Sequence, residues 1–434
     1  MRRFTVCVLI ASFVLLAVAT RSKTAETKSA PAETKKFPSA ADLPVQKDMP
    51  DPLMLPDGKK ISSPAEWKAH RAELRQMIEH YLTGTVPPPP GNVKGKIFQE
   101  TDVLDGKAKF QRVHLSFGPQ ESLGLDVGMF VPKGEGPFPT VVNISFYPTP
   151  SMNPPQPAAT DDAKDSAKDG AKKGRASPFA RVPDPETAAR GFAEALNRGY
   201  AVCTFQYTQA GADTKDTWHD TGFYAAYPEY DWHDLGAWSW AMSRCVDYLE
   251  TQPWADKAKF IALGHSRLGK TTLVAGAFDD RFAVVAPAGS GCAGTGAFRY
   301  NGKARQGKEG LEDVCKNFPQ WVTPRLADFS NQVEKLPFDQ NFLIAMVAPR
   351  AFIEAEAIDD GACNGKATKP AFLAAKPVFE FLGVPDNIGT HFRPGGHALT
   401  NDDWKAVLDF ADWRLKGKPT DQKFDVFPPD EQLH

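Results

Sequence analysis

The stretch of sequence that decides the fold is Ile261-Ala-Leu-Gly-His-Ser-Arg-Leu-Gly-Lys270. Its pattern predicts a strand that ends at Leu263, a helix that begins near Lys270, and a sharp turn between them that carries Ser266. Glycines on both sides of the serine leave room for a nucleophile elbow, a strained turn that lifts a serine hydroxyl above a sheet. A serine that caps the N-terminus of a helix is the simpler interpretation of the same residues.

Around this stretch, short apolar runs alternate with amphipathic patterns. The runs are rich in β-branched residues and predict buried strands at residues 139–146, 200–205, 259–264, 282–287 and 350–355. Helical periodicity occurs at residues 186–198, 235–251, 270–278, 369–382 and 403–415. This alternation predicts a single-domain α/β fold whose mostly parallel sheet is sandwiched by helices. Segments 113–117 and 124–131 alternate at the strand period and predict an antiparallel hairpin at one edge.

The amino-acid composition is that of a globular protein. Of the 434 residues, 42% are apolar, enough for a large core, and 51 basic against 53 acidic side chains give a net charge of -2. A chain with this balance has no polycationic character, so we expect no nucleic-acid partner. The sequence does not indicate an oligomer, and we expect a monomer.

The N-terminus has the pattern of an export signal. Arg2 and Arg3 precede an apolar run at residues 4–16, and Ala17-Val-Ala19 is a small-x-small cleavage site, so residues 1–19 are predicted to be a signal peptide. We therefore expect a secreted or periplasmic protein with no stable membrane insertion after signal removal. The alternative is an uncleaved anchor, which the short apolar run disfavours.

Two polar segments are expected to lie outside the core. Residues 20–45 are predicted to form a flexible N-terminal segment, and residues 156–177 a low-complexity loop inserted into a domain that spans residues 46–434. Five cysteines remain after the signal, an odd number, so at least one thiol is expected to be free. No two cysteines have CxxC spacing, and no string resembles HExxH, a P-loop or GxGxxG. We therefore expect no metal and no cofactor.

A serine hydroxyl is too weakly acidic to attack an acyl carbon alone, so a base must accompany Ser266. In enzymes with this elbow the chain order is serine, then a carboxylate, then histidine. His397 lies in a glycine-rich loop just before the final predicted helix and is our candidate. We assign His391, at a strand end, to structure, and we set aside His434, the last residue. We expect the side chain of His265 to point away from the hydroxyl.

The third member of such a triad is a carboxylate that fixes the imidazole tautomer. The predicted strand that starts at Arg350 runs into Asp359 and Asp360 before Gly361. Asp360 is our candidate and Asp359 the reserve. Aspartates before a glycine are also common in turns, so one of the pair is expected to serve only the turn.

Gly264-His-Ser-Arg-Leu-Gly-Lys270, together with residues 231–250 and 275–282, closely resembles the bacterial glucuronoyl esterases, carbohydrate esterase family fifteen of the α/β-hydrolase superfamily. The likeness covers roughly residues 48 to 418 and includes Leu336-Pro-Phe-Asp-Gln340 and Gly396-His-Ala398. It implies a secreted serine esterase that acts through an acyl-enzyme. The implied substrates are glucuronoxylan–lignin esters of (4-O-methyl-)glucuronic acid, or small glucuronate esters.

The resemblance also implies roles for particular residues. Arg267 is expected to contribute to the oxyanion hole, and Lys270 and Glu309 to bind the sugar. The residues after the strand at 282–287 include no carboxylate, although family members often carry the acid there, and this favours Asp360. The loop at 361–365 lacks the tryptophan that usually packs on the sugar.

Three alternatives to these implied roles stay open. Lys270 and Glu309 could be solvated surface charges, the acyl group could differ, as in an acetyl esterase, or the chain could be a catalytically silent carbohydrate-binding homologue.

Overall fold

The computed structural model describes residues 36–152, 181–301, 309–363 and 365–433. The predicted signal peptide, the part of the N-terminal segment before residue 36, the loop insertion at 156–177 and His434 lie outside the described residues. Within the described ranges, no helix is both long and apolar enough to span a bilayer.

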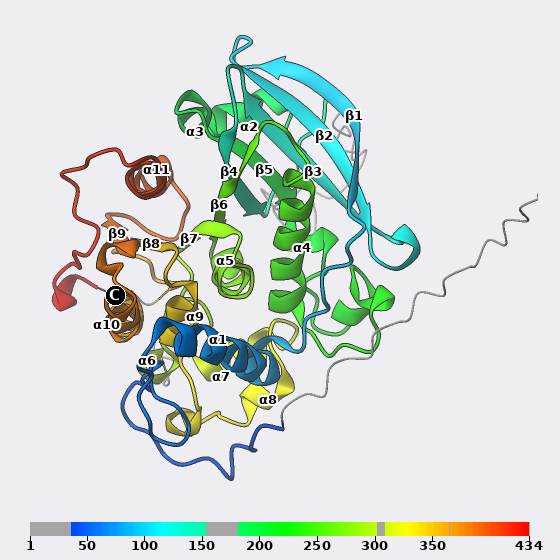
Figure 1. Cartoon of the computed structure of the whole chain (residues 1–434). Helices are drawn as coiled ribbons and strands as arrows, with labels where there is room; N and C mark the ends of the chain where they lie inside the picture. Colours follow the sequence, from blue (N-terminus) through cyan, green and yellow to red (C-terminus); the bar gives the residue numbers. More distant parts are fainter. Residues whose placement is uncertain (1–35, 153–180, 302–308, 364, 434) are drawn as a thin grey trace, which may run out of the picture. The chain divides into compact units, whose positions relative to one another are not determined.

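A nine-stranded sheet runs through the described part of the chain, in the order β1-β2-β3-β5-β4-β6-β7-β8-β9 (Figure 1). Three strands at one edge are antiparallel to their neighbours: β1 (Lys94–Val103), β2 (Ala108–Phe117) and β3 (Leu123–Pro132). The others pair in parallel: β4 (Phe138–Ser145), β5 (Ala201–Gln206), β6 (Ala255–His265), β7 (Phe282–Ala288), β8 (Ala351–Ala357) and β9 (Ile388–Arg393). The carboxyl ends of the parallel strands therefore meet along one edge, where α/β proteins place their ligands.

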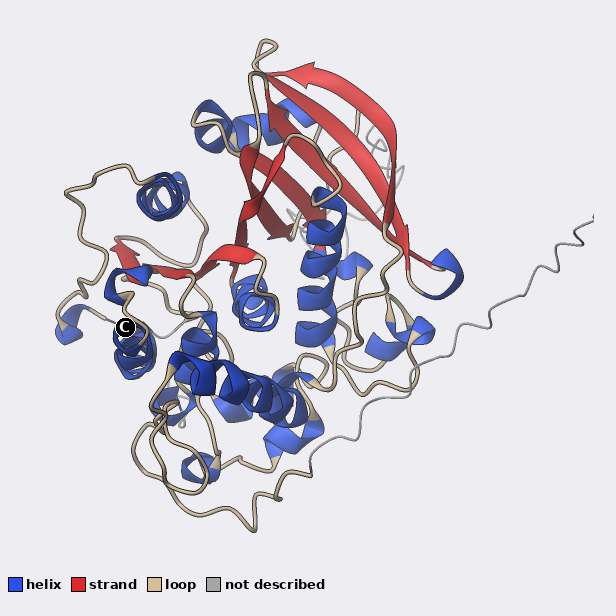
Figure 2. Ribbon diagram, viewed as in Figure 1, coloured by secondary structure: helices blue, strands red, loops and turns tan. Residues whose placement is uncertain are grey.

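Helices cover both faces of this sheet (Figure 2). One face carries α4 (Asp234–Leu249), α5 (Arg267–Phe278), α9 (Gln340–Val347) and α10 (Gly365–Phe381), and the other carries α2 (Pro185–Gly191), α3 (Ala193–Asn197) and α11 (Asn401–Lys416). The remaining α-helices of the described residues are α1 (Pro64–Ile78), α6 (Phe298–Asn301), α7 (Leu311–Asn317) and α8 (Pro324–Ala327), and a π-helix (Glu79–Thr83) follows α1. The predicted α/β fold is confirmed.

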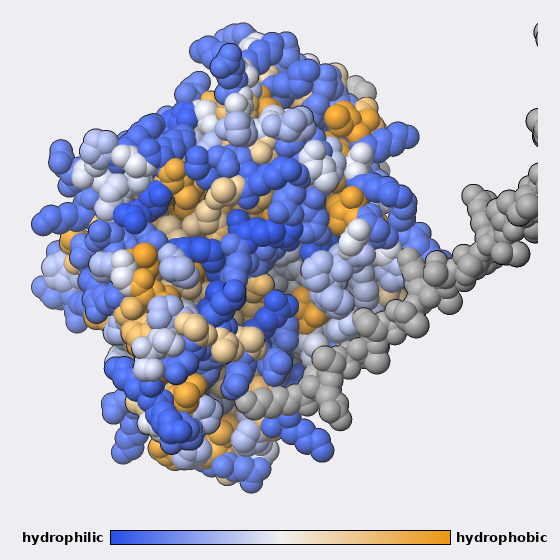
Figure 3. Space-filling view, viewed as in Figure 1, coloured by the Kyte–Doolittle hydropathy of each residue, from blue (hydrophilic) through white to orange (hydrophobic). Residues whose placement is uncertain are grey.

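Central parallel strands such as β6 contain continuous apolar runs because both of their faces are buried there. In β6, Phe260 and Ala262 belong to the core beneath α4 and α5, whereas Ile261 and Leu263 belong to the core beneath α3 and α11. Successive side chains of a strand point to opposite faces, so a strand between two helical layers has no polar face. The outer surface is mostly hydrophilic with scattered apolar residues, as Figure 3 shows for one face.

Four details differ from the predictions. The strand of the elbow ends at His265 and the helix begins at Arg267, so the turn is tighter than expected. The predicted helix at 186–198 is two helices, because Phe192 has non-helical dihedral angles. The predicted edge hairpin is a sheet of three antiparallel strands. Packing begins before residue 46, since the Phe37 ring lies 5.9 Å from that of Tyr81.

Candidate active site

Ser266 occupies the turn between β6 and α5 with a φ of 61° and a ψ of -128°. The glycines on either side of this turn are required because any larger residue would clash with neighbouring backbone atoms. A Cβ at Gly264 would lie 2.5 Å from the carbonyl oxygen of Leu268, and one at Gly269 would lie 2.8 Å from that of Ala288. Among the described residues, the Ser266 side chain makes no capping hydrogen bond to α5. The arrangement is a nucleophile elbow, and the interpretation of Ser266 as a helix cap is wrong.

The structure brings Ser266, His397 and Asp360 together. The Ser266 Oγ lies 2.9 Å from the His397 Nε2, and the His397 Nδ1 lies 2.7 Å from the Asp360 Oδ2. The other oxygen of Asp360 accepts hydrogen bonds from the backbone of Ala362 and Cys363 at 2.8 and 2.9 Å. Burial raises the pKa of Asp360, but the hydrogen bonds from His397 and the backbone outweigh it, and the net pKa is lowered. An ionised Asp360 holds the proton on Nδ1 and leaves Nε2 as an acceptor for the serine proton.

Asp359, the reserve candidate, faces a different partner. Its Oδ2 accepts a hydrogen bond from the backbone of Gly395 at 2.9 Å, and its own backbone N–H donates to the Gly395 carbonyl at 3.0 Å. The loop that delivers His397 is held from the other side by Arg393, whose Nε donates to both oxygens of Asp403 at 2.8 and 2.9 Å. Arg393 also donates to the carbonyls of Ala398 and Pro394. These contacts of Arg393 with the loop were not predicted from the sequence.

Of the other histidines, His265 differs from the expectation that its side chain points away from the site, because it lines the cavity beside Ser266. The His265 ring packs against that of His397, with centroids 4.5 Å apart. Burial first, and then the neighbouring His397, lower the pKa of His265 to about 3, so it stays neutral beside the triad. His391 lies on β9, and burial lowers its pKa too.

Arg267, the first residue of α5, points a guanidinium toward the site. Its Nη1 pairs with a carboxylate oxygen of Asp213, and its guanidinium carbon lies 4.8 Å from the ring centroid of Trp321. The Trp321 ring in turn stacks on Phe318 at 3.9 Å. The guanidinium is therefore fixed in direction by an ion pair and a cation–π contact before any ligand binds.

Asp213 is a residue that the sequence analysis did not identify. It has a φ of 58° and lies in the loop after β5. Besides Arg267, its carboxylate accepts hydrogen bonds from Trp321 Nε1 at 2.7 Å, from Gln320 Nε2 at 2.8 Å and from the Tyr207 hydroxyl at 3.0 Å. Four donors converge on one carboxylate, so Asp213 connects the guanidinium to the aromatic pair beneath it.

Lys270 and Glu309 face each other. The Lys270 Nζ lies 2.5 Å from the Glu309 Oε2 and donates to the carbonyl of Ser290 at 2.6 Å. The Lys270 side chain is 2% exposed and that of Glu309 is 18% exposed. Lys270 is thus not a solvated surface charge, and the Glu309 carboxylate is the more exposed member of the pair.

The two expected departures from the family pattern lie side by side. Gly289, after β7, has a φ of 48°, and a Cβ there would lie 3.5 Å from the Asp360 Oδ2. Cys363 occupies the loop that lacks the tryptophan; its Sγ donates to the Gly289 carbonyl at 2.8 Å and lies 3.8 Å from the His397 Nδ1.

Asp360, Cys363 and His397 are the potential metal ligands that cluster in the described part of the chain. Asp360 and His397 are already hydrogen-bonded to each other. All five cysteines that the structure describes are free.

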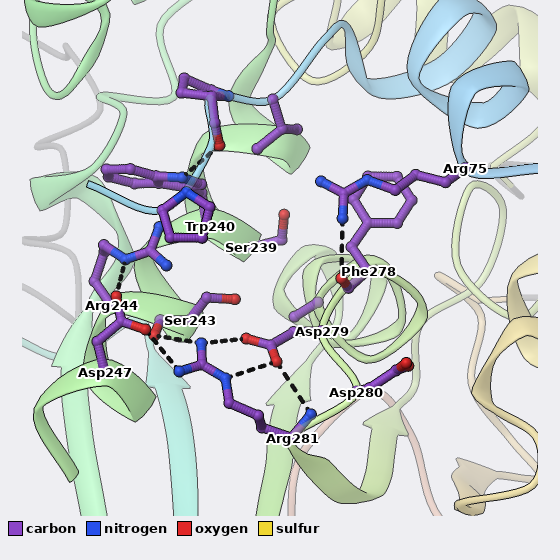
Figure 4. Close-up of a pocket in the computed structure, with 14 residues that line it drawn as sticks. Arg75, Ser239, Trp240, Ser243, Arg244, Asp247, Phe278, Asp279, Asp280 and Arg281 are labelled. Atoms are coloured by element: carbon purple, nitrogen blue, oxygen red, sulfur yellow. Dashed lines mark hydrogen bonds and ion pairs between the residues drawn. The ribbon is translucent and has the colours of Figure 1, made fainter. Parts of the chain in front are cut away.

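Two cavities lie near these elements. One, of about 790 Å³, opens beside Ser266 and His397. The other, of about 310 Å³, lies beyond the far end of α5 (Figure 4), and its charged side chains are paired with one another or with neighbours outside the lining. Arg281 there bonds Asp279 and Asp247, each at 2.7 Å, and the Arg244 Nε bonds Asp247 at 2.6 Å. The first cavity is therefore the one that adjoins the reactive groups.

Comparisons with known proteins found similar sequences and structures. The sequence profile of the family described as "Glucuronyl esterase, fungi" matches residues 172–383. The chain is 30% identical to Carbohydrate esterase MZ0003 from an unknown prokaryotic organism, over 85% of this chain and 90% of that protein. It is 27% identical to a 4-O-methyl-glucuronoyl methylesterase of Phanerochaete carnosa, over 94% of this chain and 90% of that protein. Among solved structures, a family 15 glucuronoyl esterase from Caldicellulosiruptor kristjansonii superimposes with a TM-score of 0.68 and 28% identity, covering 89% of this chain and 96% of that one.

Proposed function

Because the chain belongs to carbohydrate esterase family fifteen, the glucuronoyl esterases, we propose that it hydrolyses esters of glucuronic acid and its 4-O-methyl derivative through Ser266, His397 and Asp360. The chain is a carboxylic ester hydrolase with an α/β-hydrolase fold. The observation that carries the proposal is the unbroken line of hydrogen bonds from the serine hydroxyl through the imidazole to a buried carboxylate.

The proposed reaction begins when the Ser266 Oγ attacks the ester carbon of the uronate while the His397 Nε2 takes its proton. The negative charge that develops on the former carbonyl oxygen is stabilised by the Arg267 guanidinium and by the backbone N–H groups at the start of α5. Collapse of this intermediate breaks the bond to the alcohol, which leaves with the proton from Nε2. Water then attacks the acyl-enzyme with His397 as base, and glucuronate is released.

The natural substrate is proposed to be the ester that links glucuronoxylan to lignin, in keeping with the name of the relatives that act on 4-O-methyl-glucuronoyl esters. The proposal includes export to a secreted or periplasmic location, for which the support is the sequence pattern of residues 1–19. Lys270 and Glu309 are proposed to contribute to sugar binding as a pair, with the Glu309 carboxylate as the group that a hydroxyl reaches.

The experiment compares the wild-type protein with Ser266→Ala on methyl and benzyl glucuronate. Loss of the hydroxyl is expected to lower kcat/KM by about 10⁴-fold or more, because the groups of a triad act as a unit. Unchanged circular dichroism and melting temperature establish that the variant is folded, and Ser122→Ala, at an exposed serine, is the matched control. Activity retained in Ser266→Ala would exclude this serine as the nucleophile.

The same assay separates the alternatives that the sequence left open. Faster turnover of acetyl xylan than of methyl glucuronate would indicate an acetyl esterase instead. Labelling of wild-type protein, but not of Ser266→Ala, by a fluorophosphonate probe is expected, because only an activated serine reacts. A protein that fails to label and turns over none of these esters would be a silent homologue.

A further inference from the structure

The cavity of about 310 Å³ lies at the end of α5 that is remote from Ser266 (Figure 4). Since α5 has 12 residues and rises about 1.5 Å per residue, its two ends are about 18 Å apart. The walls of the cavity come from α1, the segment at residues 86–89, α4, and the C-terminal end of α5 with the turn after it. The described residues that line it have no part in the proposed reaction. We call it the Arg244 cavity.

The walls of the Arg244 cavity are fixed by hydrogen bonds between different elements. Trp240 Nε1, on α4, donates to the Pro87 carbonyl at 2.9 Å and holds the segment at residues 86–89 against α4. Arg75 Nη1, on α1, donates to the Phe278 carbonyl at the end of α5 at 3.1 Å. The cavity is therefore formed before any ligand binds, as most small-molecule sites are.

Arg244 is a buried guanidinium whose hydrogen bonds are incomplete. Its side chain is 1% exposed, and Figure 4 shows the guanidinium next to Trp240, with its carbon 4.3 Å from the centroid of that ring. Its Nε donates to the Asp247 Oδ2 at 2.6 Å, whereas its Nη1 is buried without a partner among the described residues. Burial lowers the pKa of Arg244. Because a buried charge needs hydrogen-bonding partners, a ligand that supplies an acceptor is favoured here.

The neighbouring Arg281 has the set of bonds that Arg244 does not have. Its Nε and Nη2 donate to the two oxygens of Asp279 at 2.9 and 2.7 Å. Its Nη1 donates to Asp247 at 2.7 Å and to Glu250 at 2.8 Å. Asp247, the carboxylate that bonds Arg244, is therefore shared with Arg281. A ligand carboxylate is the acceptor that suits Arg244, because its two oxygens match the fork of a guanidinium.

The other charged groups of the lining leave room for one negative charge. Asp280 pairs with Arg71 at 2.6 Å, and Arg75 pairs with Glu79 at 3.1 Å. Together with the bonds of the neighbouring arginine, these pairs leave Arg244 as the charged group with a buried, unpartnered nitrogen among the described lining residues. A monoanion answers this charge, whereas a second negative charge would face the carboxylates of the lining.

The size and the uncharged lining indicate what carries the carboxylate. A volume of about 310 Å³ is at the lower end of the range for ligand sites and suits a single sugar ring. Ser239 and Ser243 bring hydroxyl groups to the wall, and the Ser239 Oγ, which donates to the Gly236 carbonyl at 2.8 Å, can still accept from a ligand hydroxyl. Val86 and Phe278 add apolar surface for the carbon-bound hydrogens of a ring.

We propose that the Arg244 cavity is a second binding site that takes one hexuronate, with its carboxylate on the Arg244 guanidinium and its hydroxyls on Ser239 and Ser243. This site goes beyond the proposed function, because it needs neither an ester nor turnover. A ligand held there contacts α4 and the segment at residues 86–89 together, so binding is expected to raise the melting temperature of the protein.

The test is calorimetry of D-glucuronate with the wild-type protein and with Arg244→Met, which keeps an apolar stem on Trp240 and leaves Asp247 bonded to Arg281. Glucuronate bound near Ser266 contributes equally to both proteins, because the two sites are about 18 Å apart. The wild type is expected to show a class of sites whose affinity falls about tenfold or more in Arg244→Met, with methyl glucuronate kinetics unchanged. Arg190→Met, at an arginine that is 74% exposed, is the matched control. Identical binding by the wild type and Arg244→Met would overturn the proposal.

A second variant tests the cavity without removing the charge. Ser239→Leu fills the cavity from α4 and keeps Arg244, and the same loss of affinity is expected. Its circular dichroism and its melting temperature without ligand establish that it is folded. If Arg244→Met fails to fold, Ser239→Leu carries the test, and full affinity in this variant would overturn the proposal.

Other ligands test the assignment to a hexuronate. D-Glucose has the same ring without the carboxylate and is expected to bind the Arg244-dependent site at least about tenfold more weakly. Inorganic phosphate bound as tightly as glucuronate, with the same dependence on Arg244, would show a general anion site and overturn the assignment to a sugar acid.

Failure of this proposal can be distinguished from failure of the proposed function. Arg244-dependent binding in a protein that hydrolyses no glucuronate ester would support the cavity and overturn the function. Hydrolysis of glucuronate esters without Arg244-dependent binding would overturn the cavity and leave the function standing.

Discussion

The two sides of Ser266 differ in their lining in the absence of a ligand: one carries paired charges and the other is mostly apolar. Toward α5 and α7, the charges are already paired: Arg267 with Asp213, and Lys270 with Glu309. Toward α2 and α11, an apolar cavity stands open. A charge taken out of water needs a partner, whereas an apolar wall does not. One side of Ser266 is therefore held by paired charges, whereas the other is an open, mostly apolar cavity.

Fixed charges are favourable on the α5 side of Ser266, where negative charge develops on the oxyanion in the proposed mechanism. Donors that are already oriented need no reorganisation when the oxyanion forms, and they are worth more in a site from which water is excluded. In the proposed mechanism the ester is neutral, so Arg267 favours the transition state over the bound substrate. Asp213 offsets part of the guanidinium charge.

The largest effect on activity is expected from a change at Asp360, the carboxylate that bonds His397, because the reaction on either side of Ser266 needs the same imidazole. Asp360→Asn is expected to lower kcat/KM for methyl glucuronate by about 10⁴-fold, because an amide favours the wrong imidazole tautomer. Asp359→Asn is the matched control and should lose less than about tenfold, since its carboxylate bonds only the Gly395 backbone among the described residues. Equal losses in the two variants would contradict the assignment of Asp360.

A smaller effect on activity is expected when the Arg267 guanidinium, on the charged side of Ser266, is no longer held in a fixed orientation. Asp213→Asn removes the ion pair to Arg267 and weakens the bonds from Trp321 and Gln320. Because the guanidinium stays in place but is no longer aimed, kcat is expected to fall about 10–100-fold while KM changes little. Asp216→Asn, at an exposed position of the same loop, is the control in steady-state assays. A rise in KM with unchanged kcat would show that Asp213 acts on ground-state binding instead.

The smallest effect concerns stability rather than rate. Asp234 is buried at the start of α4 and accepts a hydrogen bond from the Tyr224 hydroxyl; burial, with the Asp213 charge, raises its pKa to about 8. The folded state therefore keeps a proton that the unfolded state releases above about pH 4, so this group's contribution to stability falls as the pH rises from about 4 to 8.

Asp234→Asn carries no such proton. The difference in melting temperature between pH 5.5 and pH 8.5 is expected to be smaller in this variant than in the wild type by about 2 °C or more, measured by scanning calorimetry. An unchanged difference would show that Asp234 is ionised in the folded protein.

The sequence was most informative about those site residues that are identified by the residues adjacent to them in the chain. The glycines around Ser266, the chain order that leads to His397, and the strand end before Asp360 each depend on a few adjacent residues, so they could be found without a structure. Asp213 could not, because its four partners come from positions up to 108 residues away and its own loop has no motif. The break at Phe192 was missed for a related reason: tertiary packing, not helical periodicity, decides where a helix turns.

Ser266 is held at a φ of 61°, a backbone state that side chains other than glycine rarely adopt. The conformation is maintained in part by the hydrogen bond from its N–H to the Ala288 carbonyl at 2.8 Å, which ties the turn to the neighbouring strand. The residue that performs the chemistry in the proposed mechanism is thus also one that opposes folding. Under that mechanism, heat adaptation of this protein must come from elsewhere in the chain, because relaxing this strained residue would abolish turnover.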